Sequence, residues 1–306
     1  EHKNFGVITF QAEDEIAAAT SALGASFGGD LIGLGVMTEL PLVVINMQRG
    51  GPSTGLPTKP EQGDLLQAVY GRNGEAPLPV LAATSPGDCF HTAYEACRIA
   101  AKFRTPVILL ADGYLGNGSE AWRIPDTDAL PAFDVEFETE ATERTMHEDQ
   151  DGNDQFLPYV RDPETLARAW ATPGTPDLEH RIGGLEKEHK TGNVSYDAKN
   201  HQKMVEIRAQ KVQNVTQDIP PTRIHGHPDG DLLVLGWGST KGAIDEAAER
   251  ANDEGLRVGS VVLRHVWPLP ADLGDVIDRF DRVLVPELNN GQLIRVLRDQ
   301  YPNRDF

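Results

Sequence analysis

The sequence has few of the residues and patterns that build redox centres, metal sites and hydrolase active sites. Its 306 residues include two cysteines, Cys89 and Cys97, whose spacing fits neither a CxxC redox pair nor the ligands of zinc or an iron–sulfur cluster. Since a free cysteine is usually a small buried residue, we expect both to lie in the core. The nine histidines form no HxxH or HExxH pattern and no GxSxG occurs, so neither a metal-centred enzyme nor a serine hydrolase is indicated.

Long apolar runs and a leader-like start are also missing. No run approaches the roughly 20 apolar residues that a membrane-spanning helix needs. The first ten residues, EHKNFGVITF, have neither the basic region nor the hydrophobic segment of a signal peptide. We therefore expect a soluble, cytoplasmic protein with no membrane partner, and its 39% hydrophobic residues suffice for a core.

Basic residues are scarce relative to acidic ones. The chain has 47 Asp and Glu against 28 Lys and Arg, a formal net charge of −19, and nine of the basic residues are lysines. A nucleic-acid partner is disfavoured because phosphate contacts require a basic surface. High acidic charge keeps a protein soluble in concentrated salt, where self-repulsion is screened, so we hypothesise a halophilic protein. Stability that stays constant from low to high salt would contradict this hypothesis.

Apolar, strand-like segments alternate with helix-like segments through the first 131 residues. The predicted strands are 5–10, 40–46, 79–85 and 105–112, and the predicted helices are 13–26 and 86–103. The strand segments are almost continuously apolar, which is typical of strands covered on both faces. The fold class is therefore predicted to be α/β with a doubly wound parallel sheet.

The character of the sequence changes twice along the chain. Residues 132–228 are rich in acidic residues, Gly and Pro and contain one credible helix, 197–215, so we expect a loop-rich connector. A second strand–helix pattern occupies residues 229–306 and predicts a second, smaller α/β domain. The predicted domains are thus 1–131, 132–228 and 229–306.

The loop 47–59, MQRGGPSTGLPTK, directly follows a predicted buried strand. It is not a P-loop, because Leu56 stands where that motif requires its phosphate-binding lysine and Lys59 comes three positions later. Ligands of open α/β sheets bind beyond the carboxyl ends of the strands, where Arg49 is placed to hold a carboxylate in a bidentate fork. A structural loop with a surface arginine explains the same composition equally well.

Two further stretches each allow two interpretations. Residues 236–242, GWGSTKG, lie between a strand and a helix, and either bind an anion through backbone amides or form a tight turn in which Ser239 or Thr240 caps the helix. The three acidic residues at 13–15 open a predicted helix, where they offset the helix dipole. Alternatively, one of these carboxylates points inward and handles a proton.

Four stretches of the sequence carry a family resemblance. They are QAEDEIAA (11–18), QRGGPSTGLPTKPEQGDLLQAVYGRNGE (48–75), TPVILLADGYLG (105–116) and VPELNNGQL (285–293). Together they resemble the α subunit of 2-oxoacid:ferredoxin oxidoreductases, nearest in variety to the 2-oxoglutarate or pyruvate enzymes of halophilic archaea. The resemblance extends over nearly the whole chain, and the loop after Gln48 is its most specific part.

The resemblance implies an activity, cofactors and partners. These enzymes convert a 2-oxoacid and coenzyme A to acyl-CoA and CO2 and pass two electrons to ferredoxin; 2-oxoglutarate is favoured here over pyruvate. The implied cofactor is thiamine diphosphate, shared with a β subunit that carries Mg²⁺ and a [4Fe–4S] cluster in a heterotetramer. The implied fold is a pyrimidine-binding-type thiamine diphosphate domain, followed after the connector by a domain like the C-terminal domain of transketolase.

The resemblance also assigns roles to single residues. Glu13 corresponds to the glutamate that hydrogen-bonds the pyrimidine ring of the cofactor and favours its imino form, a role that requires a dry pocket. Arg49 corresponds to the arginine that pairs with the substrate carboxylate, and Thr58 to a hydroxyl contact in the same pocket. The other polar side chains of the loop are expected only to shape it.

Some parts of the family pattern are not found in this sequence. These are the loop that normally precedes the glutamate, a TSGPG-like turn before the strand 40–46, and a γ-type domain. We therefore expect a fragment, and a chain that truly lacked these parts would bind thiamine diphosphate poorly. A non-catalytic or degenerate two-domain α/β assembly subunit is the alternative, which purification without an iron–sulfur partner would favour. A transketolase-type enzyme is disfavoured by the lack of a diphosphate–Mg²⁺ motif.

Overall fold

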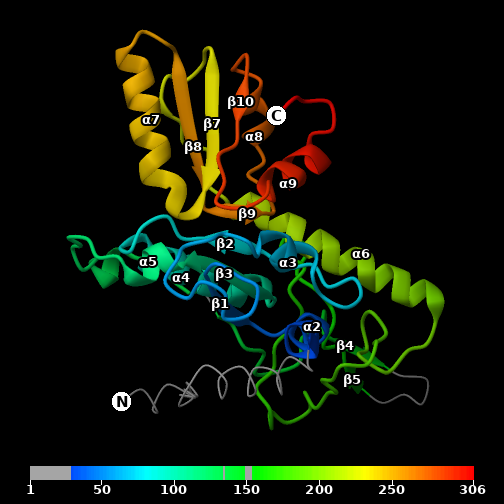
Figure 1. Ribbon diagram of the computed structural model, residues 1–306. Helices are drawn as coiled ribbons and strands as arrows, with labels where there is room; N and C mark the ends of the chain where they lie inside the picture. Colours follow the sequence, from blue (N-terminus) through cyan, green and yellow to red (C-terminus); the bar gives the residue numbers. More distant parts are fainter. Residues whose placement is uncertain (1–28, 134, 149–153) are drawn as a thin grey trace.

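The computed structural model of the chain describes residues 29–133, 135–148 and 154–306 (Figure 1). The predicted strand 5–10 and the predicted helix that contains Glu13 lie outside these residues. The described part contains two four-stranded sheets and a two-stranded ribbon. In Figure 1 the second sheet, with β7 and β8, stands above the first sheet, and the long helix α6 extends to one side.

The first sheet has the strand order β1–β3–β2–β9, and β1, β3 and β2 are parallel. Its strands are β1 (Leu42–Gln48), β2 (Val80–Ala82), β3 (Pro106–Asp112) and the antiparallel β9 (His265–Trp267). Its helices are α2 (Gly29–Thr38), α3 (Leu65–Tyr70), α4 (Asp88–Phe103) and α5 (Gly113–Asn117). The α/β class is confirmed, and every predicted element between residues 40 and 112 has its counterpart.

Both faces of the first sheet are covered, as its apolar strands predicted. Along β3, Val107 and Leu109 pack in one core cluster with α4, whereas Ile108 and Leu110 belong to a second cluster that includes residues of the other sheet. Successive side chains of a strand point to opposite faces, so one face is buried by α4 and the other by the C-terminal part of the chain. The two sheets therefore share a core.

β1 is less buried than the sequence predicted. It lies at the edge of the first sheet and pairs only with β3 among the described residues. Ile45 and Met47 are 58% and 49% exposed, although the run LPLVVIN was predicted to be a buried strand. An apolar run indicates that a strand can be buried. It does not indicate whether the strand lies in the centre or at the edge of its sheet.

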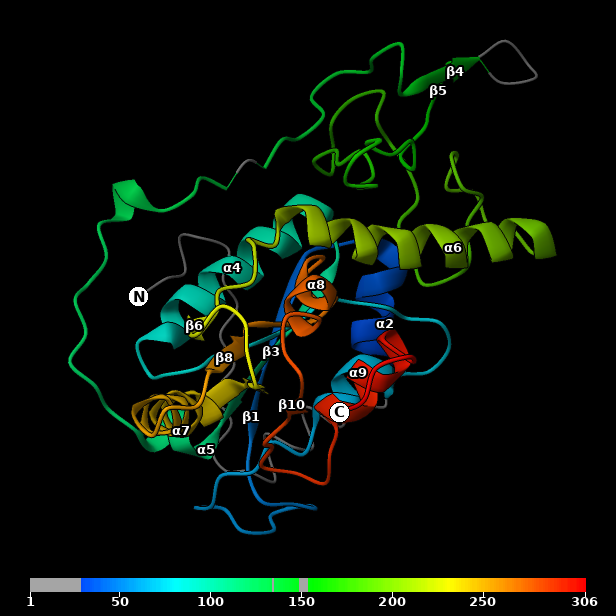
Figure 2. The same ribbon diagram turned by 90° about the horizontal axis from the view of Figure 1, so that it is seen from above.

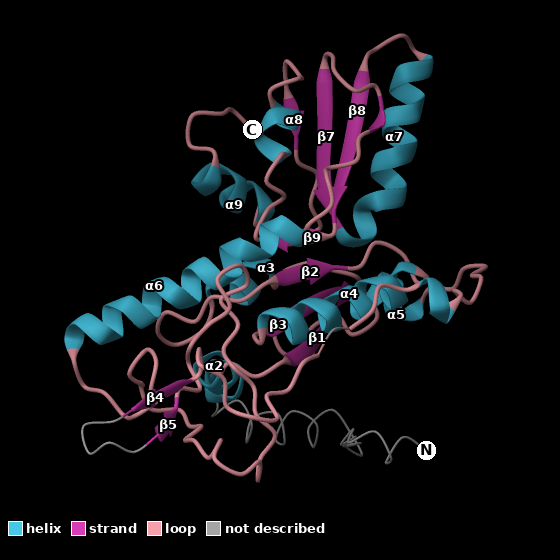
Figure 3. Cartoon of the chain, turned by 180° about the vertical axis from the view of Figure 1, so that it is seen from behind, coloured by secondary structure: helices cyan, strands magenta, loops and turns pink. Residues whose placement is uncertain are grey.

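The second sheet has the order β10–β7–β8–β6. Figure 3 shows its two long strands, β7 and β8, side by side. Its strands are β6 (His225–Gly226), β7 (Leu232–Trp237), β8 (Val258–Leu263) and β10 (Val283–Leu284), of which β6 is antiparallel. Its helices are α7 (Lys241–Asp253), α8 (Leu273–Ile277) and α9 (Leu293–Gln300). One face packs against α7 through Ile244 and Ala248, and the opposite face enters the shared core. This agrees with the predicted second α/β unit.

β9 links the two units in a way that the sequence did not predict. The segment 256–270 was expected to be a strand and its exit, but the exit itself forms a strand that joins the other sheet. There β9 runs antiparallel to β2, with His265 opposite Leu81. The predicted domain 229–306 thus supplies a strand to the sheet of the predicted domain 1–131, and the domain boundaries remain a prediction.

The connector is rich in loops, as predicted (Figure 2). It contains the short antiparallel strands β4 (Met146–Glu148) and β5 (Asp154–Phe156) and the helix α6 (Ala198–Asn214). The side chain of Asp197 caps α6 by accepting a hydrogen bond from the amide of Asn200. The apolar stripe of α6 is incomplete because Arg208 and Lys211 are buried on the same helix as Met204.

The cysteine prediction is half wrong. Cys89 is half-buried and packs against the core cluster of α4, but Cys97 is exposed. Cys97 comes one position after the buried Ala96, and a step of one residue turns a helix by about 100°, which carries the side chain off the buried face.

None of the described helices is both long and apolar enough to cross a membrane.

Candidate functional site

The loop after β1 lies at the carboxyl edge of the first sheet. Gln48, the last residue of β1, stands in register with Asp112, the last residue of β3. Beyond Gln48 the chain folds back on itself: the amide of Gly50 donates to the carbonyl of Lys59 at 3.0 Å, and Leu56 donates to Gly50 at 2.7 Å. The loop is therefore a closed structure at the place where α/β sheets bind ligands.

Both predicted substrate-binding residues belong to this closed loop. Arg49 directly precedes Gly50, and Thr58 directly precedes Lys59, so each adjoins one partner of the hydrogen bond between Gly50 and Lys59. Arg49 is half-buried, and Thr58 is exposed. Their binding role remains a prediction.

Glycine is required at one point of this loop. Gly55 has a φ of 47°, and a Cβ there would lie 2.0 Å from the carbonyl oxygen of Gly50. No side chain fits such an approach, so Gly55 is needed for the loop to close. The structure also supports the exclusion of a P-loop, because residues 51–60, including Lys59, are exposed and no helix begins within them.

Two buried glutamines hold the two ends of the loop, and the sequence analysis named neither. Gln48 donates to the carbonyl of Ala111 at 3.3 Å and accepts from the amide of Asp64 at 3.0 Å. Gln62 donates to Oδ2 of Asp112 at 3.1 Å. In the sequence, the one signal of these glutamines is a polar residue next to the end of a predicted strand. An exposed loop gives the same signal.

The capping interpretation of residues 236–242 is wrong for the described structure. Thr240 stands at the N-cap of α7 without a side-chain capping bond, and its hydroxyl donates to the carbonyl of Trp237 at 2.7 Å. The hydroxyl of Ser239 instead donates to the carboxylate of Asp112, in the other sheet. This turn therefore makes its polar contacts with the candidate site.

The match to a known family rests on most of the described chain. Residues 30–200, more than half of the chain, match the family described as pyruvate flavodoxin/ferredoxin oxidoreductase, thiamine diphosphate-binding. The chain belongs to this family. Residues 230–305 match a further family, the pyruvate:ferredoxin oxidoreductase core domain II. The oxidoreductase resemblance read from the sequence is confirmed.

Two relatives of this chain have names that agree with one another. The 2-oxoglutarate oxidoreductase subunit KorA of Mycobacterium tuberculosis is 52% identical over 98% of this chain and 47% of its own length. The 2-oxoglutarate synthase subunit KorA of Archaeoglobus fulgidus is 29% identical over 95% of this chain and 78% of its own length. The likeness to α-type subunits is thereby established, whereas the haloarchaeal variety remains a prediction.

A solved structure agrees with this family membership. The 2-oxoglutarate:ferredoxin oxidoreductase from Magnetococcus marinus, with 2-oxoglutarate, coenzyme A and succinyl-CoA bound, matches with a TM-score of 0.81 and 31% identity. The match covers 97% of this chain and 53% of the other. The chain thus spans about half the length of this oxidoreductase and of the M. tuberculosis relative.

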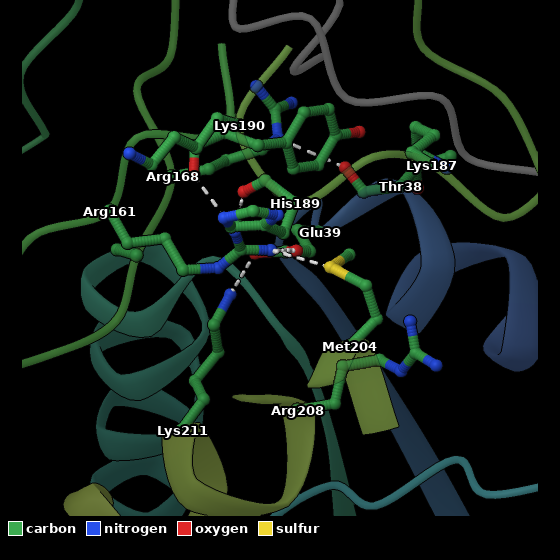
Figure 4. Close-up of polar contacts among 12 residues, drawn as sticks. Thr38, Glu39, Arg161, Arg168, Lys187, His189, Lys190, Met204, Arg208 and Lys211 are labelled. Atoms are coloured by element: carbon green, nitrogen blue, oxygen red, sulfur yellow. Dashed lines mark hydrogen bonds and ion pairs between the residues drawn. The ribbon is translucent and has the colours of Figure 1, made fainter. Parts of the chain in front are cut away.

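A buried ion cluster forms a second polar centre of this family member (Figure 4). Glu39 follows α2 directly, has a φ of 53° and is 2% exposed. Its carboxylate accepts hydrogen bonds from Arg161 of the connector and from Lys211 of α6. The cluster thereby joins Glu39 to two segments that lie 122 and 172 residues further along the chain, and no pattern in the sequence predicted it.

The charges of this cluster depend on one another. Burial by itself raises the pKa of Glu39, but Lys211 and Arg161 outweigh it and lower that pKa to about 2. Burial lowers the pKa of Lys211, and the carboxylate of Glu39 opposes that shift. Two cations thus share one buried anion, and loss of the anion would leave both uncompensated.

The described residues hold no group of three or more His, Cys, Asp or Glu side chains placed to bind a metal ion. Both carboxylate oxygens of Asp112 accept hydrogen bonds, Oδ1 from the amides of Tyr114 and Leu115 and Oδ2 from Gln62 and Ser239. Glu13, predicted to contact the cofactor, lies outside the described residues. What the site offers is therefore an arginine-bearing loop at the edge of the sheet.

Proposed function

We propose that this chain belongs to the α subunit of a thiamine diphosphate-dependent 2-oxoacid:ferredoxin oxidoreductase, with 2-oxoglutarate as the substrate. The reaction would take one 2-oxoacid, one coenzyme A and two oxidised ferredoxins to acyl-CoA, CO2, two reduced ferredoxins and a proton. The closed loop that holds Arg49 at the carboxyl edge of the sheet carries this proposal. It is supported by the 52% identity to a 2-oxoglutarate oxidoreductase subunit.

Arg49 would bind and orient the substrate. A guanidinium offers two parallel N–H donors that match the two oxygens of a carboxylate, which fixes both the distance and the direction of the 2-oxoacid. Thr58, in the same closed loop, would add a hydroxyl contact. Fixing the carboxylate holds the neighbouring keto carbon in place, so that binding energy is converted into orientation.

We infer that this chain holds the pyrimidine end of thiamine diphosphate through Glu13, which lies outside the described residues. Glu13 would hydrogen-bond the pyrimidine ring and hold the proton there. When bound, the cofactor supplies the carbanion that attacks the keto carbon. We assign Mg²⁺, the diphosphate grip and the [4Fe–4S] cluster to the β subunit, as the family resemblance implies. The two cysteines of this sequence are fewer than the four thiolates that such a cluster needs.

Apolar side chains around the loop suit a partner subunit. Ile45 and Met47 on β1, Leu56 in the loop and Tyr114 at the start of α5 are between 49% and 61% exposed. Exposed apolar residues that gather around a polar site are typical of interfaces. We infer that the β subunit covers this edge of the sheet in a cytoplasmic heterotetramer.

The test is purification of the full-length subunit with its partner, followed by ferredoxin reduction with coenzyme A and a panel of 2-oxoacids. We expect a complex of two α and two β subunits, and a kcat/KM with 2-oxoglutarate at least about tenfold above that with pyruvate or branched 2-oxoacids. A higher value with pyruvate would overturn the substrate assignment. A complex that binds its partner but reduces no ferredoxin would favour the assembly subunit instead.

A further inference from the structure

The two sheets meet at Gln62, directly behind the Arg49 loop. The side-chain amide of Gln62 is buried and lies 3.1 Å from Oδ2 of Asp112, 3.4 Å from the carbonyl oxygen of Trp237 and 3.4 Å from Oγ of Ser239. Ser239 donates to the same oxygen of Asp112. The carboxyl ends of β3 and β7, one from each sheet, are thereby joined through one side chain. Gly238 permits this approach, since a Cβ there would lie 2.3 Å from Nε2 of Gln62.

The orientation of this amide is fixed by its surroundings. Nε2 faces a carboxylate and a carbonyl, so a reversed amide would place its oxygen against two other acceptors. The cost of the observed orientation is that Oε1 is buried without a hydrogen-bond partner. A buried unsatisfied acceptor is rare and destabilising. Gln62 therefore joins the ends of β3 and β7 through the two N–H donors of its side-chain amide.

The backbone behind the loop is held from the second unit as well. The amide of Gln62 donates to the carbonyl of Leu288 at 3.0 Å, and Asn289 donates to the carbonyl of Gln62 at 2.9 Å. Gln292 donates to the carbonyl of Gly63 at 2.5 Å and accepts from the amide of Leu66 at 3.0 Å. The chain from Gln62 to Leu66 is thus bound to residues more than 200 positions away.

The position of Arg49 depends on these anchors. On the other side of the loop, Gln48 is tied to Ala111, next to Asp112, and to Asp64. Both ends of the loop therefore converge on the end of β3, whereas residues 51–60 between them are exposed. An exposed loop is positioned mainly by its ends, because solvent-exposed contacts within it are weak and readily exchanged.

We propose that the turn after β7 positions the substrate-binding loop, with Gln62 and Ser239 as positioning residues that act through Asp112. The second unit would thus control the placement of Arg49. This inference rests on the proposed function for its kinetic consequence only. Residues 236–242 thereby have a positioning role, which differs from both the anion-binding role and the helix-capping role that the sequence suggested.

The matched experiment compares Ser239→Ala with Ser260→Ala in the full complex. Each change removes one hydroxyl that donates to an aspartate, but Ser260 donates to Asp245 within the second unit. For Ser239→Ala we expect the KM for the 2-oxoacid to rise about five- to tenfold, with kcat within about twofold and unchanged thiamine diphosphate affinity. For Ser260→Ala we expect a KM within about twofold of wild type.

A second measurement does not depend on turnover. Hydrogen exchange of the amides in residues 49–61 should become faster in Ser239→Ala and in Gln62→Leu, and stay unchanged in Ser260→Ala. Faster exchange in an enzyme that uses no 2-oxoacid would refute the proposed function and retain the positioning role. An unchanged KM together with unchanged exchange in both variants would overturn the positioning role, as would equal effects of Ser239→Ala and Ser260→Ala.

Discussion

Replacement of Arg49 by alanine is expected to lower kcat/KM for the 2-oxoacid by about 100- to 1,000-fold, since it removes two charge-assisted hydrogen bonds to the substrate carboxylate. Arg49 stands at the closed base of the loop, next to the bond between Gly50 and Lys59. Steady-state ferredoxin reduction measures the loss, and direct titration of thiamine diphosphate should show unchanged affinity.

Two further variants separate charge from geometry at this position. Arg49→Lys keeps the charge but loses the planar fork, so its kcat/KM should fall between those of wild type and Arg49→Ala. Arg223→Ala removes an exposed arginine two residues before β6 and should leave kcat/KM within about twofold of the wild-type value. If Arg49→Ala kept the wild-type kcat/KM, the carboxylate contact would be wrong.

Replacement of Glu39 by glutamine is expected to lower the free energy of unfolding by about 3–5 kcal/mol, the usual cost of breaking a buried ion pair from one side. The amide cannot balance Arg161 and Lys211, whose side chains are 7% and 3% exposed, so the cost of burying these two cations would no longer be offset. Urea unfolding followed by circular dichroism measures the change. Glu246→Gln, which breaks the exposed pair with Arg250 on α7, is the control and should cost less than about 1 kcal/mol.

The same carboxylate predicts a pH dependence of stability. The pKa of Glu39 is lowered from 4.5 to about 2 in the folded state, so the folded protein binds fewer protons here than the unfolded chain does. The stabilisation is therefore complete above pH 4.5 and is lost as the pH falls towards 2. Between these values, the unfolding free energy of Glu39→Gln should fall less steeply with acid than that of wild type. Parallel curves would contradict the assigned ionisation.

Much of the fold was predictable because its signals are local. β3 and α4 were predicted within two residues of their ends, since a continuous apolar run and a 3.6-residue period each depend on neighbours in the chain. β9 was missed because its three residues follow β8 after a single residue, and no local pattern tells which sheet they will join. The exposure of Cys97 and of Ile45 was missed for a related reason, since burial depends on what packs against a residue.

The candidate site likewise contains residues that a local sequence pattern marks and residues that it does not mark. Arg49 and Thr58 were found in a loop whose glycine and proline content marks it in the sequence, and the structure adds the hydrogen bond between Gly50 and Lys59 that closes this loop. Gln62 carries no such mark, because its partners Asp112 and Ser239 are 50 and 177 positions away. Its importance arises only when those groups are desolvated together.

By itself the sequence determined the α/β class, the loop with Arg49 and the family to which the chain belongs, because residue type and spacing are sufficient to specify them. Only the tertiary structure decided which charges meet in the interior. Glu39 becomes an obligatory anion when Arg161 and Lys211 are brought to it from 122 and 172 positions away. Likewise, Ser239 becomes part of the substrate loop's support when the two sheets close on one core. Both results depend on removal of water from groups that are distant in the chain, and no local pattern encodes that step.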